Sequence, residues 1–344
     1  MLFLRKQDFI IMQLERIIKR YRELGIENQI DYSKFYLYSL ITHSTAIEGS
    51  TITELENQIM FDDGVSLAGK SIEEQNMNLD LKVAYEKSFD LIKNKTPLTI
   101  DILIMLSALV MKNTGQEYKT ILGDFSSSKG ELRLLNVTAG IGGKSYMNFS
   151  KVPAKLEEFC KQINIERQNF STKSIEELYQ ISFDAHYNLV TIHPWADGNG
   201  RMARLMMNML QFEFGLIPTK ILKEDKEDYI KALVATRETE DLDIFRKFMT
   251  DIMVKNLDKE IENYLDSIGE TDNIQKVQTK EKIKSRDVII TLLRKDGTLN
   301  TASLASQIGI TTKAVEKHLS KLKSEGIIER IGSNKTGYWK VNKL

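Results

Sequence analysis

The twelve residues HPWADGNGRMAR, at positions 193–204, constrain this chain more than any other segment. They join two apolar stretches with helical spacing, 175–192 and 199–214, through a loop that contains two glycines. Glycines permit positive φ and leave room beside the backbone, so the amide groups of such a loop can converge on one point. A helix that starts there adds the positive end of its dipole. The segment therefore predicts an anion-binding loop between two packed helices.

The side chains of this loop suit the chemistry of a polyphosphate. Arg201 and Arg204 are three positions apart and share one helix face beside the glycines. Two guanidinium groups next to an amide nest fit a polyphosphate better than one small anion. Asp197 offers a hard carboxylate oxygen next to those phosphates, which is how Mg²⁺ is usually held. His193, at the end of the preceding helix, can take a proton from an attacking hydroxyl group.

Each of these features has an ordinary structural explanation when it occurs alone. A histidine at a helix end is usually structural, paired arginines usually solvate a helix face, and an aspartate before a glycine is common in turns. Their conjunction within twelve residues favours a site that combines a base, a metal ion and a phosphate.

The segment resembles the motif HPFx[D/E]GNGRxxR of the Fic family. Eight of its nine specified positions match, and the exception is Trp195, an aromatic residue where Phe is usual. The resemblance extends over roughly residues 30–265. It implies a mainly α-helical fold, a Fic core that carries a small β-hairpin flap.

Fic proteins mostly transfer AMP from ATP to a Ser, Thr or Tyr hydroxyl group of a protein. The resemblance implies that His193 is the general base and that Asp197 binds Mg²⁺, or Mn²⁺ in its place. It assigns the phosphates to Gly198, Asn199, Gly200, Arg201 and Arg204. It also implies ATP and a target protein as partners, and a second copy of the chain through self-modification or a homodimer.

A flap and a nucleoside pocket are expected around this loop. The β-prone pieces 132–137 and 146–149, separated by glycines, predict a hairpin. Gly130 and Arg133 resemble the GxxR opening of the family's flap, whose edge can hold a target chain as an added strand; the alternative is an ordinary solvent-facing hairpin. Asn208 and Tyr229 are candidates for the adenosine side, although a packed helix would look the same.

A second motif lies far upstream of the loop. Ser44 and Glu48 are one helical turn apart in STAIEG, which resembles the inhibitory motif [S/T]xxxE[G/N] of the Fic family. In the family, this glutamate pairs with the second arginine of the loop motif, here Arg204, and competes with the γ-phosphate of ATP. The resemblance therefore implies an autoinhibited enzyme; without the loop, Glu48 would read as a surface residue at a helix end.

The last 60 residues form a separate unit with a different charge. Residues 285–344 hold 11 Lys and Arg against 5 Asp and Glu, although the whole chain has a formal net charge of zero. The order of three short helices and two strands resembles a winged helix–turn–helix. Its third helix carries a lysine stripe and its wing a further lysine, which suit a DNA backbone or a protein partner: Lys313, Lys317, Lys321 and Lys335.

Four segments follow along the chain. An N-terminal helical region with the inhibitory motif covers 1–95, the catalytic core 96–267, a polar linker 268–284 and the winged domain 285–344. The single cysteine, Cys160, and a start without the order of a secretory signal favour a reduced, cytoplasmic compartment. The longest apolar run is too short to span a bilayer, so no membrane partner is expected.

Three functions remain open from the sequence. The first is autoinhibited transfer of AMP from ATP to a protein hydroxyl group. The second keeps the scaffold and changes the transfer, to removal of AMP or to movement of another nucleotidyl or phosphoryl group. The third is a DNA-binding regulator whose Fic part only senses a nucleotide. The presence of His193 argues against the third, because a sensor needs no base.

Overall fold

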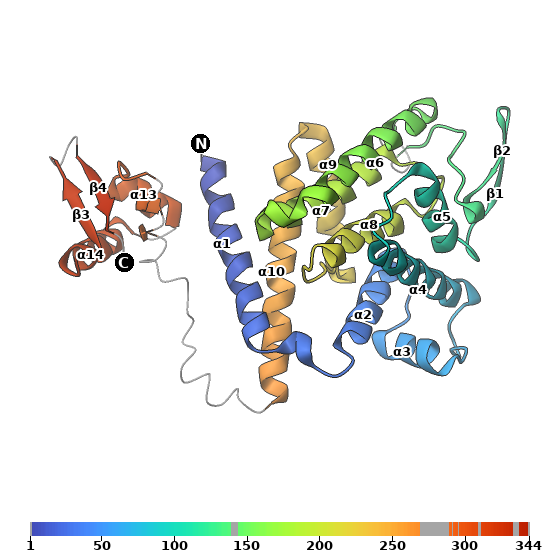
Figure 1. Cartoon of the computed structure of the whole chain (residues 1–344), viewed down its shortest axis with the longest axis horizontal. Coiled ribbons are helices and arrows are strands. Elements are labelled where there is room, and N and C mark those ends of the chain that lie inside the picture. Colours follow the sequence, from blue (N-terminus) through green and yellow to red (C-terminus); the bar gives the residue numbers. More distant parts are fainter. Residues whose placement is uncertain are drawn as a thin grey trace. The chain divides into compact units, whose positions relative to one another are not determined.

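The computed structural model describes residues 2–138, 144–268, 289–290, 292–294, 296–308, 311–332 and 337–342. The chain divides into two compact units, one of Leu14–Lys259 and the other of Met1–Gln13 together with Glu260–Leu344. Helices dominate the fold, and the regular strands of the described residues form two antiparallel two-stranded sheets (Figure 1). The predicted fold class is confirmed.

The first part of the chain forms a succession of helices, of which the first and the last cross the bounds of the larger unit. In chain order up to residue 267 they are α1 (Leu2–Glu23), α2 (Tyr32–Ile47), α3 (Glu54–Asp63), α4 (Ile72–Lys93), α5 (Ile100–Val110), α6 (Val152–Asn169), α7 (Ile175–Ile192), α8 (Asn199–Glu213), α9 (Lys226–Thr239) and α10 (Leu242–Ser267). Reciprocal capping boxes begin three of them, α3 at Thr53, α4 at Ser71 and α7 at Ser174. The bounds of α7 are those that the sequence predicts.

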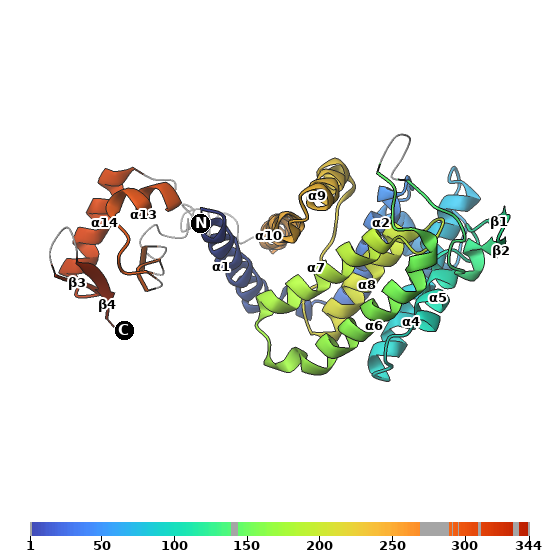
Figure 2. The same cartoon turned by 90° about the horizontal axis from the view of Figure 1, so that it is seen from above.

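Helix α8 forms the centre of the core. Twelve of its fifteen residues are buried, as expected for a helix that is enclosed on all sides. It packs against α7, α4, α5 and α2, and the two views agree that it runs through the middle of these helices (Figures 1 and 2). The loop of residues 193–198 leads directly into this helix, so the candidate site is anchored to a buried helix.

The β structure differs from the prediction. The regular hairpin consists of β1 (Glu117–Thr120) and β2 (Gly123–Ser126), upstream of the predicted strands. Its two-residue turn, Ile121 and Leu122, lacks the Gly or Asn that usually marks a hairpin, so no turn signal is present at these positions. The predicted strands at 132–137 and 146–149 are not regular, and their limbs are joined by the isolated bridge between Thr138 and Ser145.

A buried arginine explains why these limbs do not form a ladder. The guanidinium of Arg133 donates to the carbonyl oxygens of Leu135, at 2.7 Å, and Met147, at 2.5 Å. These carbonyls are therefore taken by a side chain that lies between the two limbs, instead of by backbone amides across a ladder. Residues 130–138 and 144–150 are called the flap below.

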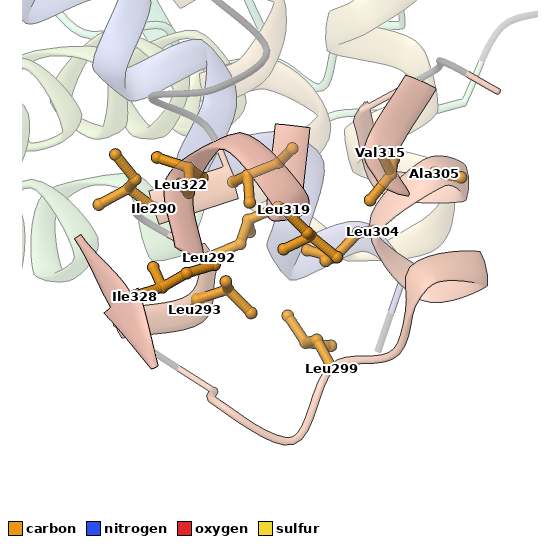
Figure 3. Close-up of a cluster of buried hydrophobic side chains, with 11 residues drawn as sticks. Ile290, Leu292, Leu293, Leu299, Leu304, Ala305, Val315, Leu319, Leu322 and Ile328 are labelled. Carbon is orange, nitrogen blue, oxygen red and sulfur yellow. The ribbon is translucent and has the colours of Figure 1, made fainter. Parts of the chain in front are cut away.

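The C-terminal domain has its own small core. It contains α13 (Thr301–Ile308), α14 (Thr312–Ser324) and the antiparallel strands β3 (Ile328–Ile331) and β4 (Tyr338–Val341). Figure 3 shows the buried side chains that hold these elements together, among them Leu293, Leu304, Leu319 and Ile328. This contiguous cluster is the hydrophobic core of the domain.

Two predicted features fall partly or wholly outside the described residues. The linker 268–284 lies outside them except for Ile268, and Lys335 of the wing lies outside them as well. The boundary predicted at residue 95 has no counterpart in the two compact units, since Leu14–Lys259 includes most of the predicted segments 1–95 and 96–267.

Among the described residues, every helix is too short or too polar to cross a lipid bilayer.

Candidate active site

His193 is the residue that caps the C-terminus of α7 and begins the loop. Its backbone has φ 51° and ψ 63°, in the left-handed region, and its amide donates to the Leu189 carbonyl at 3.0 Å. The ring Nδ1 lies 3.3 Å from the carbonyl oxygen of Val190. Since a carbonyl can only accept, Nδ1 carries the proton in this contact and Nε2 keeps its lone pair. That tautomer can take a proton from a hydroxyl group.

The surroundings of His193 favour its neutral form. Burial lowers the pKa of this imidazole to about 4, and the positive charges of Arg133 and Arg237 act in the same direction, whereas the Val190 carbonyl opposes them. A ring with such a pKa is unprotonated at neutral pH. His193 therefore has the protonation state of a general base.

The aromatic residue of the motif fastens the loop to the flap. Trp195 is completely buried, and its indole Nε1 donates to the carbonyl of Gly130 at 2.9 Å. Gly130 has φ 68°, and a Cβ there would lie 2.0 Å from the carbonyl oxygen of Ile104. Arg133 adds a donation from Nε to the His193 carbonyl at 2.7 Å. Gly130 and Arg133 thus hold the loop in place, a structural role that accompanies the predicted one at the flap.

Gly198 in the loop and Gly200 in the first turn of α8 lie close to neighbouring side chains. A Cβ on Gly198, whose φ is 81°, would lie 2.7 Å from the sulfur of Met111. A Cβ on Gly200 would lie 2.8 Å from Oε1 of Glu48. The side-chain amide of Asn199 is turned inward, where it donates to the Trp195 carbonyl at 2.9 Å and accepts from the Trp195 amide at 3.1 Å. Asn199 therefore closes the loop, so its contribution to an anion site comes from its backbone.

Arg201 is a buried cation with weak partners. Its residue is 3% exposed, and Nη1 lies 3.4 Å from the Val110 carbonyl while Nη2 lies 3.0 Å from the Met111 sulfur. Nη2 is 3.9 Å from the carboxylate of Asp197, and Nε has no hydrogen-bond partner among the described residues. A buried guanidinium with so little compensation is costly unless an anion binds to it. Burial also lowers the pKa of Arg201.

Arg204 is held by the inhibitory motif. Its Nε donates to the Ser44 hydroxyl at 2.8 Å, and Nη2 donates to the Ser44 carbonyl at 3.0 Å and to Oε1 of Glu48 at 2.5 Å. Burial by itself would raise the pKa of Glu48, but the charge and hydrogen bond of Arg204 outweigh it and the pKa is lowered. Glu48 is therefore a carboxylate. The structure brings Ser44, Glu48 and Arg204 together as the motifs predict.

A buried polar network fixes the helix that carries this motif, and no local sequence pattern predicts this network. Thr45 donates to Oδ1 of Asn78 at 2.8 Å, and the Asn78 amide donates to the Ser50 hydroxyl at 3.1 Å. Asn57 donates to the same Asn78 oxygen at 2.9 Å and to Thr42 at 2.7 Å. Residues 42–50 are thus tied to α3 and α4 on both sides of Ser44 and Glu48.

The two predicted adenosine residues lie in the interior beside α8. Asn208 accepts from the Tyr85 hydroxyl at 2.7 Å and donates to the Thr219 carbonyl at 3.0 Å. The Tyr229 hydroxyl lies 3.0 Å from Nε2 of His186, a ring whose pKa burial lowers to about 3. Both side chains are almost fully buried. Their contact with a nucleoside stays a prediction.

Asp197, the predicted ligand of a divalent cation, lies on the surface of the loop. Its side chain is 60% exposed, and Oδ1 accepts from the Gly198 amide at 2.6 Å. No group of three or more His, Cys, Asp or Glu side chains that could hold a metal occurs among the residues that the structure describes. Mg²⁺ commonly binds through one or two carboxylates together with substrate phosphates. Asp197 beside the glycine loop fits that arrangement, in which the ion would neutralise phosphate charge.

In the C-terminal domain, the lysine stripe lies on the surface of α14. Lys313, Lys317 and Lys321 are all exposed, while Val315 and Leu319 of the same helix are buried. Thr311 caps the helix by accepting from the Ala314 amide at 3.2 Å. The structure therefore gives a second helix of a helix–turn–helix pair with a cationic outer face.

The chain matches two family models at the positions of these two sites. Residues 97–211 match the Fic/DOC family, and residues 288–329 match a family described as winged helix-turn-helix DNA-binding. The chain thus contains a Fic domain and a C-terminal winged helix–turn–helix domain.

Curated relatives carry the same Fic region. "Protein adenylyltransferase Fic" of Nematostella vectensis is 33% identical over 197 residues, which are 56% of this chain and 42% of the relative. The protein of the same name from Drosophila grimshawi is 29% identical over 223 residues, 63% of this chain and 41% of the relative. The chain therefore spans about two fifths of the length of these relatives.

Solved structures share the fold. A segment of Fic-1 from C. elegans superposes with a TM-score of 0.60 at 21% identity, covering 76% of this chain and 74% of that one. A Fic family protein from Desulfovibrio desulfuricans superposes with a TM-score of 0.58 at 18% identity, covering 97% and 95%. At these identities the likeness concerns the fold.

Proposed function

We propose that this protein is an autoinhibited adenylyltransferase that transfers AMP from ATP to a hydroxyl group of a protein. The observation that carries the proposal is the buried, weakly compensated Arg201 beside the glycine loop, with the neutral His193 at the other end of that loop. An anion site and a base four residues before Asp197 are the two parts that a nucleotidyl transfer needs. The names of the curated relatives support the same activity.

The proposed reaction balances as an in-line displacement at the α-phosphorus. The target hydroxyl oxygen forms a bond to the α-phosphorus while the bond to the β-phosphate oxygen breaks, and pyrophosphate leaves. The hydroxyl proton goes to Nε2 of His193. Arg201 stabilises charge on the β-phosphate, and Arg204 is positioned for the γ-phosphate. Asp197 would hold a divalent cation, which would supply further neutralisation of the phosphate charge.

The contact between Glu48 and Arg204 supports the autoinhibited form of the proposal. A carboxylate that already accepts from Nη2 of Arg204 at 2.5 Å competes with the γ-phosphate for the same donor. ATP held without that contact would place its α-phosphate poorly for in-line attack. Low basal activity of the unmodified protein is therefore expected.

Mass spectrometry of a cell lysate treated with the Glu48→Gly variant, ATP and Mg²⁺ tests the activity. We expect AMP adducts on Ser, Thr or Tyr of one or a few proteins, and the spectra identify donor group, target and residue type together. A parallel incubation with GTP, CTP and UTP tests the donor. Adducts of another nucleotidyl group or of phosphate alone would replace the proposed reaction by another transfer on the same scaffold.

Removal of AMP is the enzymatic alternative, because a carboxylate at Glu48 can also position water. Incubation of a purified AMP-modified target with the wild-type protein distinguishes removal of AMP from its transfer. Release of AMP by the unmodified protein, lost in Glu48→Gly, would favour removal.

The pH dependence of transfer should reflect the depressed pKa of His193. A base acts in its neutral form, and burial lowers the pKa of this ring to about 4, so activity is complete above that pH and is lost as the pH falls through it. We expect kcat of the Glu48→Gly variant to be nearly constant between about pH 6 and 8. An acid limb with its midpoint near the ordinary histidine pKa would contradict the assigned environment of His193.

A second function, DNA binding, is favoured by the exposed cationic face of α14. Three phosphate contacts each contribute about one to the slope of log affinity against log salt. We expect the triple change of Lys313, Lys317 and Lys321 to alanine to lower that slope by about three. Lys323→Ala is the control, since Lys323 is exposed on another side of the same helix. Equal slopes in all three proteins would point to a protein partner for this domain.

A further inference from the structure

We propose that Tyr146 of the flap is a positioning residue for His193, and that it holds the imidazole in the plane from which Nε2 meets the target hydroxyl group. The proposal rests on the proposed transfer reaction and extends it to a residue that lies outside both sequence motifs. It is carried by a stack of side chains from three separate parts of the larger unit.

The first contact of this stack is between the two rings. The ring centroids of Tyr146 and His193 are 3.8 Å apart and the rings are 16° from parallel. Each ring therefore covers one face of the other. A stacked neighbour prevents rotation of the imidazole out of its plane but leaves the ring edge, where the nitrogen atoms lie, open to other partners.

The second contact fixes the imidazole within its plane. Nδ1 of His193 lies 3.3 Å from the Val190 carbonyl, which leaves Nε2 directed away from the end of α7. Tyr146 controls the tilt of the ring and Val190 its rotation. Both degrees of freedom of the base are thus set before a target binds, which is the requirement for efficient proton transfer.

The third contact supports Tyr146 from its own side. The guanidinium carbon of Arg237, on α9, lies 5.1 Å from the centroid of the Tyr146 ring, a cation–π distance. The Nε atom of Arg237 is buried with no hydrogen-bond partner among the described residues. Because Arg237 makes this cation–π contact with Tyr146, its positive charge lies close to His193 and disfavours the imidazolium form.

Hydrogen bonds within the flap fix the backbone position of Tyr146. The Tyr146 amide donates to the Val137 carbonyl at 3.0 Å, and the neighbouring Met147 carbonyl accepts from Arg133 at 2.5 Å. Arg133 in turn donates to the His193 carbonyl at 2.7 Å. The buried side chain of Arg133 therefore joins the backbone of the flap to the backbone of His193. This link keeps Tyr146 and His193 in a fixed relative position.

The test compares Tyr146→Ala and Tyr146→Phe, each in the Glu48→Gly background. We expect Tyr146→Ala to lower kcat by on the order of 10- to 100-fold with the KM for ATP unchanged, since misplacement of a base affects the chemical step. Tyr146→Phe should restore kcat, because it keeps the ring. Tyr118→Ala is the matched control, since Tyr118 is also in a stacked pair, with Phe125 at 4.9 Å in the β1–β2 hairpin.

A second readout does not depend on activity. The chain has four histidines, so the imidazole protons can be assigned by NMR with a His193→Gln variant. The ring current of Tyr146 should shift the His193 signals upfield in the parent and in Tyr146→Phe, and this shift should be lost in Tyr146→Ala. The same shift in all three proteins, or a loss of kcat in Tyr146→Ala that Tyr146→Phe does not restore, would overturn the proposal.

The two readouts separate this inference from the proposed function. A parent without AMP transfer but with the upfield shift would contradict the proposed function and leave the stack on His193 in place. A parent with transfer in which Tyr146→Ala raises only the KM for ATP would contradict the positioning role and leave the proposed function in place.

Discussion

Replacement of Glu48 by glycine is expected to raise AMP transfer by about 10- to 100-fold, because a charge-assisted hydrogen bond of about 1.5–3 kcal/mol is removed from the γ-phosphate donor. In the resting protein, Oε1 of Glu48 accepts from Nη2 of Arg204 at 2.5 Å. The backbone tolerates the change, since Glu48 lies at the end of α2 and not within it. The measurement is incorporation of labelled AMP from ATP with Mg²⁺.

Stabilisation of the protein by bound ATP is a second measurement of the effect of Glu48→Gly. Arg204 is 3% exposed and remains buried in the variant, where a γ-phosphate can take the place of the lost carboxylate. ATP should therefore raise the Tm of Glu48→Gly more than the Tm of the unmodified protein. Glu54→Gly is the control, because Glu54 pairs with His43 at 3.0 Å and does not contact Arg204. Equal AMP incorporation in wild type and Glu48→Gly would contradict the proposed autoinhibition by Glu48.

Replacement of His193 by alanine in the Glu48→Gly background is expected to lower transfer by at least about 10²- to 10⁴-fold, the usual contribution of a general base. The Nε2 lone pair is the proton acceptor in the proposed reaction, and burial with a pKa of about 4 keeps it available at neutral pH. Binding of ATP should persist, because Arg201, Arg204 and the glycine loop are unchanged. The measurements are kcat for AMP transfer and the Kd for ATP by calorimetry.

The control for this prediction is His318→Ala. His318 is half-buried on α14 in the C-terminal domain, and its loss should leave transfer unchanged. A His193→Ala variant that keeps its activity would contradict the assignment of the base. Loss of ATP binding in His193→Ala would instead assign this side chain to the nucleotide site.

Much of the helical framework could be predicted because its signals are local. The start of α7 follows from Ser174, whose hydroxyl group caps the first turn of the helix, and its length follows from apolar residues at helical spacing. The loop between α7 and α8 could be predicted as a site because its base, carboxylate, glycines and arginines are neighbours in the chain. Short-range geometry alone places them close together.

The flap could not be predicted to the same extent. Its strands are not regular because Arg133 takes the carbonyls of Leu135 and Met147, and no local pattern shows that a charged side chain will be buried between two limbs. The β1–β2 hairpin was missed for a related reason. Its turn residues, Ile121 and Leu122, are apolar yet exposed, so the usual turn chemistry is absent.

By itself, the sequence determined the loop chemistry, the order of the helices and the two motifs, since each depends on residues within a few turns of one another. The resemblance to the Fic family implied that Glu48 pairs with Arg204, 156 positions further along the chain, and the structure brings the two together. Only the tertiary structure decided that Tyr146 of the flap stacks on His193. These contacts depend on how α2, α8 and the flap pack together, and packing is set by the whole core.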